Sequence, residues 1–155
     1  DIIPYVTDPT AWAALTTGAW CYYNNDPSSG YGKLYNWYAV ETDKLCPMGW
    51  HVPSDSEWTV LETYLGTGAG KKMKSTSGWE SDGNGTNLFG FSGLAGGARN
   101  LNGTFGGINT YGYWWSSTQE DTDYAYNRYL YAHNDYPYFN EYSIKKGLSV
   151  RCLRD

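Results

Sequence analysis

Apolar and polar residues between positions 45 and 66 are spaced first as in a strand and then as in a helix. Residues 50–52 have the pattern of a short strand, and Pro53 ends it because proline cannot donate to a β-ladder. Ser54 and Glu57 have the S-x-x-E spacing of a capping box, which begins a helix. The apolar positions that follow recur at helical spacing and are Trp58, Leu61 and Leu65. This segment predicts a strand, a sharp turn and a helix over 55–65, around which we expect the domain to fold.

Two other segments have helical signals, and the second half of the chain has strand signals. Asp8 and Pro9 suit the start of a helix over 9–16, and the apolar stripe within 33–41 predicts another. From residue 66 onward, glycine-rich turns separate short aromatic runs, which predicts short and mostly antiparallel strands. We therefore expect residues 1–155 to form one loop-rich α+β domain with two to three helices.

The segment 124–131 alternates with period two and so predicts a strand with two different faces. One face carries Tyr126, Arg128 and Leu130, and we interpret it as structural. The other face carries Asn127, Tyr129 and Tyr131 and has no evident core task. We predict that this second face points outward from a central strand.

The composition indicates an irregular fold with an aromatic core, because the chain has 16 Tyr, 8 Trp and 19 Gly with only 17% charged residues. We predict one core cluster, formed by Trp12, Trp37, Trp50, Trp58, Trp79, Trp114 or Trp115, and Leu61. The net charge of −5 and the lack of a basic run argue against a nucleic acid partner. No apolar run is long enough to span a bilayer, which argues against direct membrane insertion.

Three cysteines cannot all pair within one chain. The interpretation that we prefer is one bridge between Cys46 and Cys152, with Cys21 reduced and buried. Both bridge candidates adjoin apolar, strand-like segments far apart in sequence. The alternative is three reduced and buried thiols, since free cysteine is among the most buried residue types.

Few side chains have the spacing of a metal or catalytic site. His51 lies between apolar neighbours, and we expect a buried, hydrogen-bonded histidine rather than a ligand or a base. The oxygen-rich residues Asp82, Asn84 and Asn87 make calcium a candidate cofactor, although Asx turns explain the same pattern without metal. We therefore expect no metal site and no other cofactor.

Five motifs, in matching order over nearly the whole chain, resemble the Fibrobacter succinogenes major paralogous domain. They are GKLYNWYAV at 32–40, LCPMGWHVPSDSEW at 45–58, FSGLAGGARNLNGTF at 91–105, GYWWSST at 112–118 and GLSVRCLRD at 147–155. The resemblance implies a C-type-lectin-like fold of the formylglycine-generating-enzyme type, in which a long bridge near the last strand is common. It also implies a bacterial surface or secreted protein of Bacteroidetes type, such as an outer-membrane lipoprotein or a pilus-associated protein. We expect the chain to be the C-terminal part of such a protein.

The enzymes of this fold use chemistry that the sequence does not reproduce. One group oxidises a substrate cysteine with a copper-binding cysteine pair, but residues 99–136 contain no cysteine. Another group binds non-haem iron through several histidines, whereas this chain has only His51 and His133. We therefore predict that the protein is not an enzyme, and keep a metal-dependent enzyme related to this group as the alternative.

The segment 118–143 is rich in Tyr, Asn, Asp, His, Ser and Thr, which is typical of an adaptable binding surface. The residues that we predict to bind a ligand are Gln119, Asp121, Asp123, Asn127, Tyr129, Tyr131, His133, Asn134, Asp135, Tyr136, Tyr138 and Asn140. The partner would be a protein or a glycan on another cell or in the environment. The composition also resembles the variable regions that diversity-generating retroelements produce in C-type-lectin-fold proteins. A passive structural domain within a surface protein is the third hypothesis.

Overall fold

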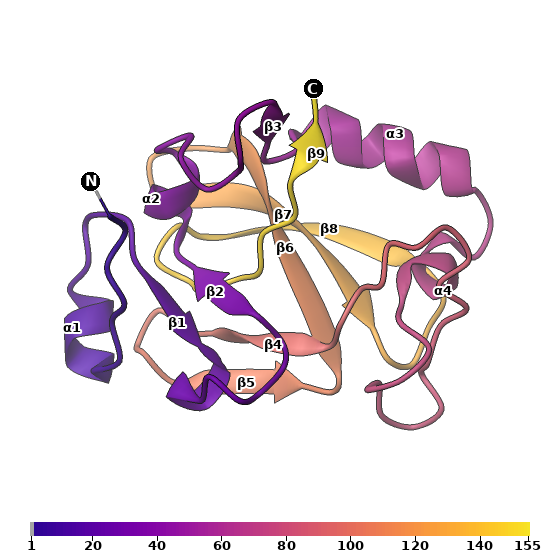
Figure 1. Ribbon diagram of the computed structural model, residues 1–155, viewed down its shortest axis with the longest axis horizontal. Helices are drawn as coiled ribbons and strands as arrows, with labels where there is room; N and C mark the ends of the chain where they lie inside the picture. Colours follow the sequence, from indigo (N-terminus) through magenta and orange to yellow (C-terminus); the bar gives the residue numbers. More distant parts are fainter. Residues whose placement is uncertain (1) are drawn as a thin grey trace.

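The structure is a computed structural model that describes residues 2–155 (Figure 1); Asp1, the first residue of the predicted domain, lies outside the described part. Its elements, in chain order, are α1 (Pro9–Ala13), β1 (Trp20–Tyr22), η1 (Tyr23–Asn25), β2 (Lys33–Tyr35), α2 (Trp37–Val40), β3 (Trp50–His51), α3 (Asp55–Leu65), α4 (Ala69–Met73), β4 (Gly96–Arg99), β5 (Phe105–Ile108), β6 (Tyr111–Gln119), β7 (Tyr124–Tyr131), β8 (Pro137–Ser143) and β9 (Leu153–Arg154).

A five-stranded sheet with the order β5-β4-β6-β7-β8 forms the centre of the protein. All its neighbours are antiparallel except β4 and β6, which are parallel. The strands β1 and β2 form a second small sheet, and β3 and β9 a third. The helix α3 packs against one face of this sheet, over β6 and β7. Figure 1 shows α1 at the opposite side of the molecule from α3. This architecture confirms the predicted α+β fold class with mostly antiparallel strands.

The segment 45–66 forms the strand, turn and helix that its pattern predicts. Ser54 accepts a hydrogen bond from the Glu57 N–H, and the Glu57 carboxylate accepts one from the Ser54 N–H at 2.8 Å. This reciprocal capping box starts α3 at Asp55, and Gly66 ends it.

The cysteines pair as predicted. Cys46 and Cys152 form a disulfide with their Cα atoms 5.7 Å apart. Cys21 is free and buried, and burial raises the pKa of its thiol to about 11. The bridge ties the last residues of the chain to the start of the organising segment, where β9 pairs with β3 (Figure 1).

Two predicted helices are shorter than expected, and the described residues contain four α-helices rather than two or three. The helix predicted over 9–16 ends at Ala13. The helix predicted over 33–41 is wrong in its first half, because 33–35 pairs with β1 and forms β2. Asn36 then caps α2 by accepting a hydrogen bond from the Ala39 N–H, so helix geometry begins only at Trp37.

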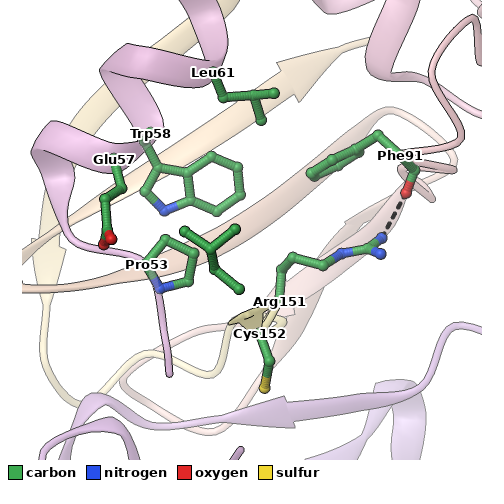
Figure 2. A pocket seen from close by; sticks show the side chains of 8 residues that line it. Pro53, Glu57, Trp58, Leu61, Phe91, Arg151 and Cys152 are labelled. Atoms are coloured by element: carbon green, nitrogen blue, oxygen red, sulfur yellow. Dashed lines mark hydrogen bonds between the residues drawn. The ribbon is translucent and has the colours of Figure 1, made fainter. Parts of the chain in front are cut away.

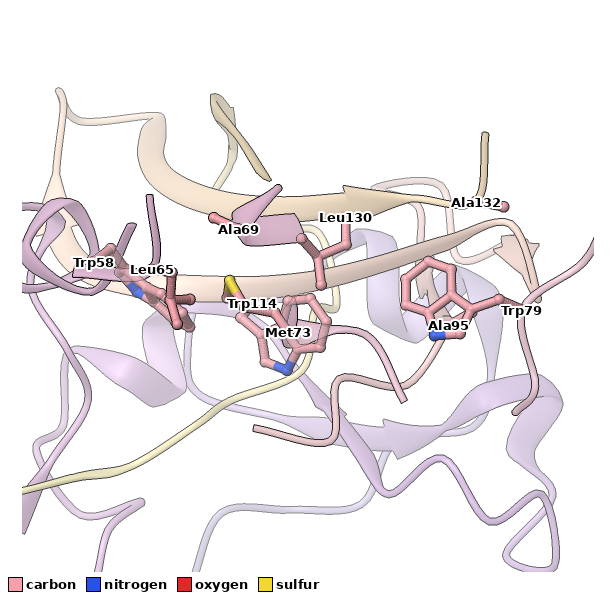
Figure 3. Packing of buried hydrophobic residues seen from close by; sticks show 9 residues of the cluster. All are labelled: Trp58, Leu65, Ala69, Met73, Trp79, Ala95, Trp114, Leu130 and Ala132. Atoms are coloured by element: carbon pink, nitrogen blue, oxygen red, sulfur yellow. The ribbon is translucent and has the colours of Figure 1, made fainter. Parts of the chain in front are cut away.

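The prediction of a single core cluster is wrong, because the buried residues form three separate clusters. Trp114 and Trp115 are adjacent on β6 and are both buried, with their side chains on opposite faces. Trp114 packs with Trp58, Leu65 and the α4 residues in the cluster of Figure 3. Trp115 packs with Trp37 and Val40 of α2, while Trp12 belongs to the third cluster.

Two residues of the predicted core lie nearer the surface than expected. Trp50 is 44% exposed, because it lies in the two-residue edge sheet of β3 and β9. Leu61 is half-buried, whereas Trp79 is buried as predicted.

Arg128 attaches α3 to the central sheet. Its guanidinium donates to Asp55 and Glu62, which lie about two turns apart on α3, and to the Thr59 hydroxyl at 3.1 Å. Arg128 is 3% exposed and Leu130 is 1% exposed. The predicted structural role of these two residues is therefore confirmed.

Candidate functional site

The strand register collects six tyrosines from β6, β7 and β8 on one face of the central sheet. Tyr113 lies opposite Tyr129, which in turn lies opposite Tyr138 on the next strand. This surface, the tyrosine face, consists of Tyr111, Tyr113, Tyr129, Tyr131, Tyr138 and Tyr142. It lies on the side of the sheet opposite to Arg128 and α3, because residues of opposite parity on a strand point to opposite faces.

The rings of the tyrosine face pack against one another across the strands. Tyr111 and Tyr131 are stacked with ring centroids 4.8 Å apart, and Tyr129 and Tyr138 are stacked at 4.9 Å. Tyr113 lies between Tyr129 and Tyr142, at 5.6 Å and 5.7 Å. Tyr138 is 37% exposed and the other five side chains are half-buried. The result is a continuous aromatic layer that still reaches the surface.

Burial and neighbouring rings raise the pKa of three tyrosines in this layer. Burial raises the pKa of Tyr113, and the neighbouring Tyr142 raises it further. Burial also raises the pKa of Tyr111 and Tyr129, with smaller contributions from adjacent tyrosines. Such a surface combines apolar ring area with polar hydroxyl groups, which is the chemistry used in protein and sugar contacts.

Asn127 does not point outward, so this part of the predicted binding face is wrong. It is 0% exposed, and its side-chain amide donates to the Asn140 carbonyl at 3.0 Å. Asn127 lies opposite Trp115, whose ring is buried against the α2 side of the core. This face of β7 is therefore part of the core at Ala125 and Asn127, and only its second half carries rings that reach the surface, those of the half-buried Tyr129 and Tyr131.

Four of the predicted site residues meet in a polar pocket at the end of the tyrosine face. His133, Asn134, Asp135 and Tyr136 form one wall of this pocket, which has a volume of about 380 Å³. Residues 81–84 form the opposite wall, and Lys71 closes one side. The pocket is continuous with the tyrosine face, because the Tyr131 ring meets the His133 ring edge to face at 4.9 Å.

Lys74, which the sequence pattern did not single out, holds this pocket wall in place. It is 1% exposed, and its ammonium donates to the carbonyls of Tyr131 and Asn134 at 3.1 Å and 2.8 Å. Burial lowers the pKa of its amine. The sequence around Lys74 gives no signal of this role, because the backbone carbonyls that its ammonium satisfies lie about sixty residues away.

Two glycines let the pocket walls approach each other closely. A Cβ on Gly83 would lie 2.5 Å from the Ala132 carbonyl oxygen, and a Cβ on Gly70 would lie 2.7 Å from the Tyr136 carbonyl carbon. Any side chain at either position would push residues 132–136 outward. The pocket is therefore built on packed backbone and is formed before any ligand arrives.

The remaining predicted residues lie apart from this pocket. Gln119 ends β6, and Asp121 and Asp123 belong to the turn between β6 and β7, at the other end of β7 from His133. The Asp121 carboxylate accepts hydrogen bonds from the Asp123 and Tyr124 N–H groups and so fixes that turn. Asn140 is exposed on β8. The predicted residues thus divide between two ends of a hairpin rather than forming one patch.

Three members of the tyrosine face were missing from the predicted site: Tyr142 on β8, and the β6 pair Tyr111 and Tyr113. The signal was present in the sequence, because the two alternate within 111–117 with the period of a strand. Only the register of β6 against β7 shows that they share a face with Tyr129 and Tyr131.

The candidate metal ligands and His51 have other roles in the structure. The Asn84 and Asn87 side-chain oxygens accept hydrogen bonds from the Trp79 and Ser92 N–H groups, each five residues away, so they hold this loop together without forming the predicted Asx turns. Across residues 2–155, no three His, Cys, Asp or Glu side chains come together in a group that could hold a metal ion.

His51 is half-exposed rather than buried, because the edge strand β3 carries it. Its ring contacts the carboxylates of Asp155 at 2.6 Å and Glu57 at 3.0 Å. These hydrogen bonds raise the pKa of His51.

None of the helices in the described part of the chain is both long and apolar enough to cross a membrane.

The comparisons with known proteins give one match. A protein-family model described as the Fibrobacter succinogenes major domain matches residues 1–154. No curated protein and no solved structure matches the chain. The family match covers the disulfide, the tyrosine face and the polar pocket.

Proposed function

Because the chain belongs to the Fibrobacter succinogenes major domain family, we propose that it is a ligand-binding module of a bacterial surface protein and not an enzyme. In this proposal it presents the tyrosine face and the adjoining polar pocket to a protein or a glycan. The observation that carries the proposal is the stacked and partly exposed layer of six tyrosines across β6, β7 and β8. A soluble domain gains nothing from keeping so many aromatic rings at its surface, whereas a binding site does.

The form of the site suits binding without chemistry. Rigid aromatic rings offer contact area at low entropic cost, and the pocket beside them adds the polar groups of Asp135, Asn134 and His133. Both surfaces are fixed by packed backbone, so little ordering is needed when a partner docks. The proposal requires neither calcium nor another cofactor.

An extracellular or cell-surface location forms part of the same proposal, as in an outer-membrane lipoprotein or a pilus-associated protein. The disulfide between Cys46 and Cys152 supports it, because such bonds persist in oxidising compartments. The C-type-lectin-like character of the fold is likewise proposed. It is supported by the strand, turn and helix at 50–65 and by the bridge that precedes the last strand.

Retroelement-driven variation is a separate part of the proposal. The residues that would vary are those whose side chains leave the core, such as Tyr138 and Asn140 on β8. Sequencing the locus from several isolates tests this idea. Substitutions no denser on β7 and β8 than elsewhere would contradict it.

The binding role can be tested with protein and glycan arrays probed with the intact chain. Once a ligand is found, Tyr138→Ala is expected to weaken it by about 1–2 kcal/mol, as loss of an aromatic anchor does. Tyr64→Ala is the matched control, because this side chain is 73% exposed on α3, which lies on the other side of the sheet. Equal losses for both variants would show that the ligand does not use the tyrosine face.

A further inference from the structure

A second pocket lies on the other side of the central sheet and is lined almost entirely by apolar groups. It has a volume of about 220 Å³. Figure 2 shows Trp58 and Leu61 descending from α3, Phe91 facing them, and the Arg151 side chain running beneath. Pro53 closes the pocket beside Trp58. A mainly apolar pocket with a few polar groups is the usual form of a small-molecule site.

Arg151 places a positive charge at one end of this pocket. Its guanidinium lies 4.5 Å from the centre of the Phe91 ring and donates one hydrogen bond, at 2.6 Å, to the Phe91 carbonyl. Arg151 is half-buried, and burial lowers its pKa. Within residues 2–155 this guanidinium has no carboxylate partner, whereas Arg128 has two.

The one carboxylate that lines the same pocket does not neutralise Arg151. Glu57 accepts hydrogen bonds from the Ser54 N–H and hydroxyl, and its other oxygen contacts His51 at 3.0 Å. Figure 2 shows the Glu57 carboxylate and the Arg151 guanidinium at opposite ends of the pocket. The Phe91 end therefore keeps an uncompensated cation next to an apolar cavity.

We propose that this pocket binds a small carboxylic acid with an apolar body. The carboxylate pairs with the free N–H groups of Arg151, and the apolar body packs against Trp58 and Leu61. Arginine donors suit a carboxylate, because the planar guanidinium can donate two parallel hydrogen bonds to it. The low polarity of the pocket strengthens this charge pairing and excludes neutral polar ligands, whose groups would stay unpaired.

The pocket is preformed, which reduces the entropic cost of binding. Arg151 precedes Cys152, which is fixed by the disulfide to Cys46. The opposite wall is α3, which its capping box and the Arg128 ion pairs hold on the sheet. This site is separate from the tyrosine face and does not depend on the proposed function.

The test is a titration of the intact chain with 3-phenylpropanoate and with the neutral 3-phenylpropanamide, followed by NMR. The indole N–H signal of Trp58 is a local probe, because its ring lines the pocket. We expect saturable shifts with the acid at a Kd on the order of 1 mM, as for a small ligand of this size. The amide should bind at least about tenfold more weakly, because it cannot form the charge-assisted pair.

Three variants make the test specific. Arg151→Gln is expected to weaken the acid by about tenfold or more. Arg154→Gln is the matched control, since Arg154 is an exposed arginine three residues further on that does not line the pocket. Leu61→Trp fills the cavity from a half-buried position on α3 and should abolish binding of both compounds. Each variant is first checked for an unchanged dispersion of its NMR spectrum.

The possible outcomes separate clearly. Binding of the acid that is lost in Arg151→Gln and Leu61→Trp but kept in Arg154→Gln establishes the site. The proposal is overturned if neither compound gives saturable shifts at concentrations up to about tenfold above the expected Kd. It is also overturned if the acid and the amide bind with equal affinity. Equal losses in the two arginine variants would also overturn it, because they would indicate general charge attraction.

Discussion

Replacing Arg128 with methionine tests how the organising helix is held on the sheet. The guanidinium of Arg128 bridges Asp55 and Glu62, which lie about two turns apart on α3. The Arg128 side chain is 4% exposed. Methionine keeps a similar length and apolar stem but removes the charge and every hydrogen bond. The variant leaves two carboxylates on α3 without their cation.

The expected magnitude follows from the burial of the partners. Removing one member of a buried ion pair costs about 3–5 kcal/mol when the other charge stays buried. The side chains of Asp55 and Glu62 are 35% and 26% exposed, so water recovers part of their solvation. We therefore expect Arg128→Met to lower the free energy of unfolding by about 2–4 kcal/mol. The corresponding fall in Tm is roughly 4–16 °C for a chain of this size.

Urea unfolding followed by tryptophan fluorescence measures this loss, with Arg154→Met as the exposed control. The control should stay within about 0.5 kcal/mol of the wild type. Adding Glu62→Gln to Arg128→Met should cost little more, because the pair is already broken. A loss below about 1 kcal/mol, or fully additive losses, would show that apolar packing alone holds α3 in place.

Three further predictions concern the core, the disulfide and pH. Trp58→Ala should cost about 3–5 kcal/mol of unfolding free energy. Trp58→Phe should cost clearly less, because the buried indole N–H has no acceptor that the change would leave unpaired. Denaturant titration of both variants distinguishes the contribution of ring volume from that of hydrogen bonding. Reduction of the Cys46–Cys152 bridge, which spans 106 residues, should cost about 4–5 kcal/mol by chain entropy; a wild-type Tm that is insensitive to reductant would contradict this. The raised pKa of His51 means that its ion pairs with Asp155 and Glu57 stabilise the fold below the ordinary histidine pKa of 6.5, and that this contribution is lost as pH rises through the folded-state pKa. Tm measured from pH 5.5 to 8.5 should therefore fall more in the wild type than in His51→Gln.

Local sequence signals were enough to determine the organising segment and its ends. The capping box at Ser54 and Glu57, the helical spacing of Trp58 and Leu65, and the stop at Gly66 all act within about one to three helical turns. The pairing of Cys46 with Cys152 was also correct; both residues adjoin strand-like segments far apart in sequence, and the family resemblance implies a long bridge near the last strand. The period-two pattern of 124–131 placed Arg128 and Leu130 on the structural side.

Long-range contacts decided the features that the sequence left open. The period-two alternation of 124–131 places Asn127 on the same face as Tyr129 and Tyr131. The α2 side of the core covers that end of β7, however, and so buries Asn127. Lys74 belongs to a run of lysines of the kind usually found at the surface. Its ammonium is nevertheless buried and donates hydrogen bonds to backbone carbonyls about sixty residues further on.

The tyrosine face and the apolar pocket have the same origin. Each is made from segments that are separate in sequence. The tyrosine face combines β6, β7 and β8, and the apolar pocket combines Trp58 with Arg151. Periodicity tells which residues of one element share a face, because it depends on the geometry of that element alone. Which face is covered, and by which other segment, depends on strand order, register and chain crossing. These are properties of the whole packed chain, and only the tertiary structure determines them.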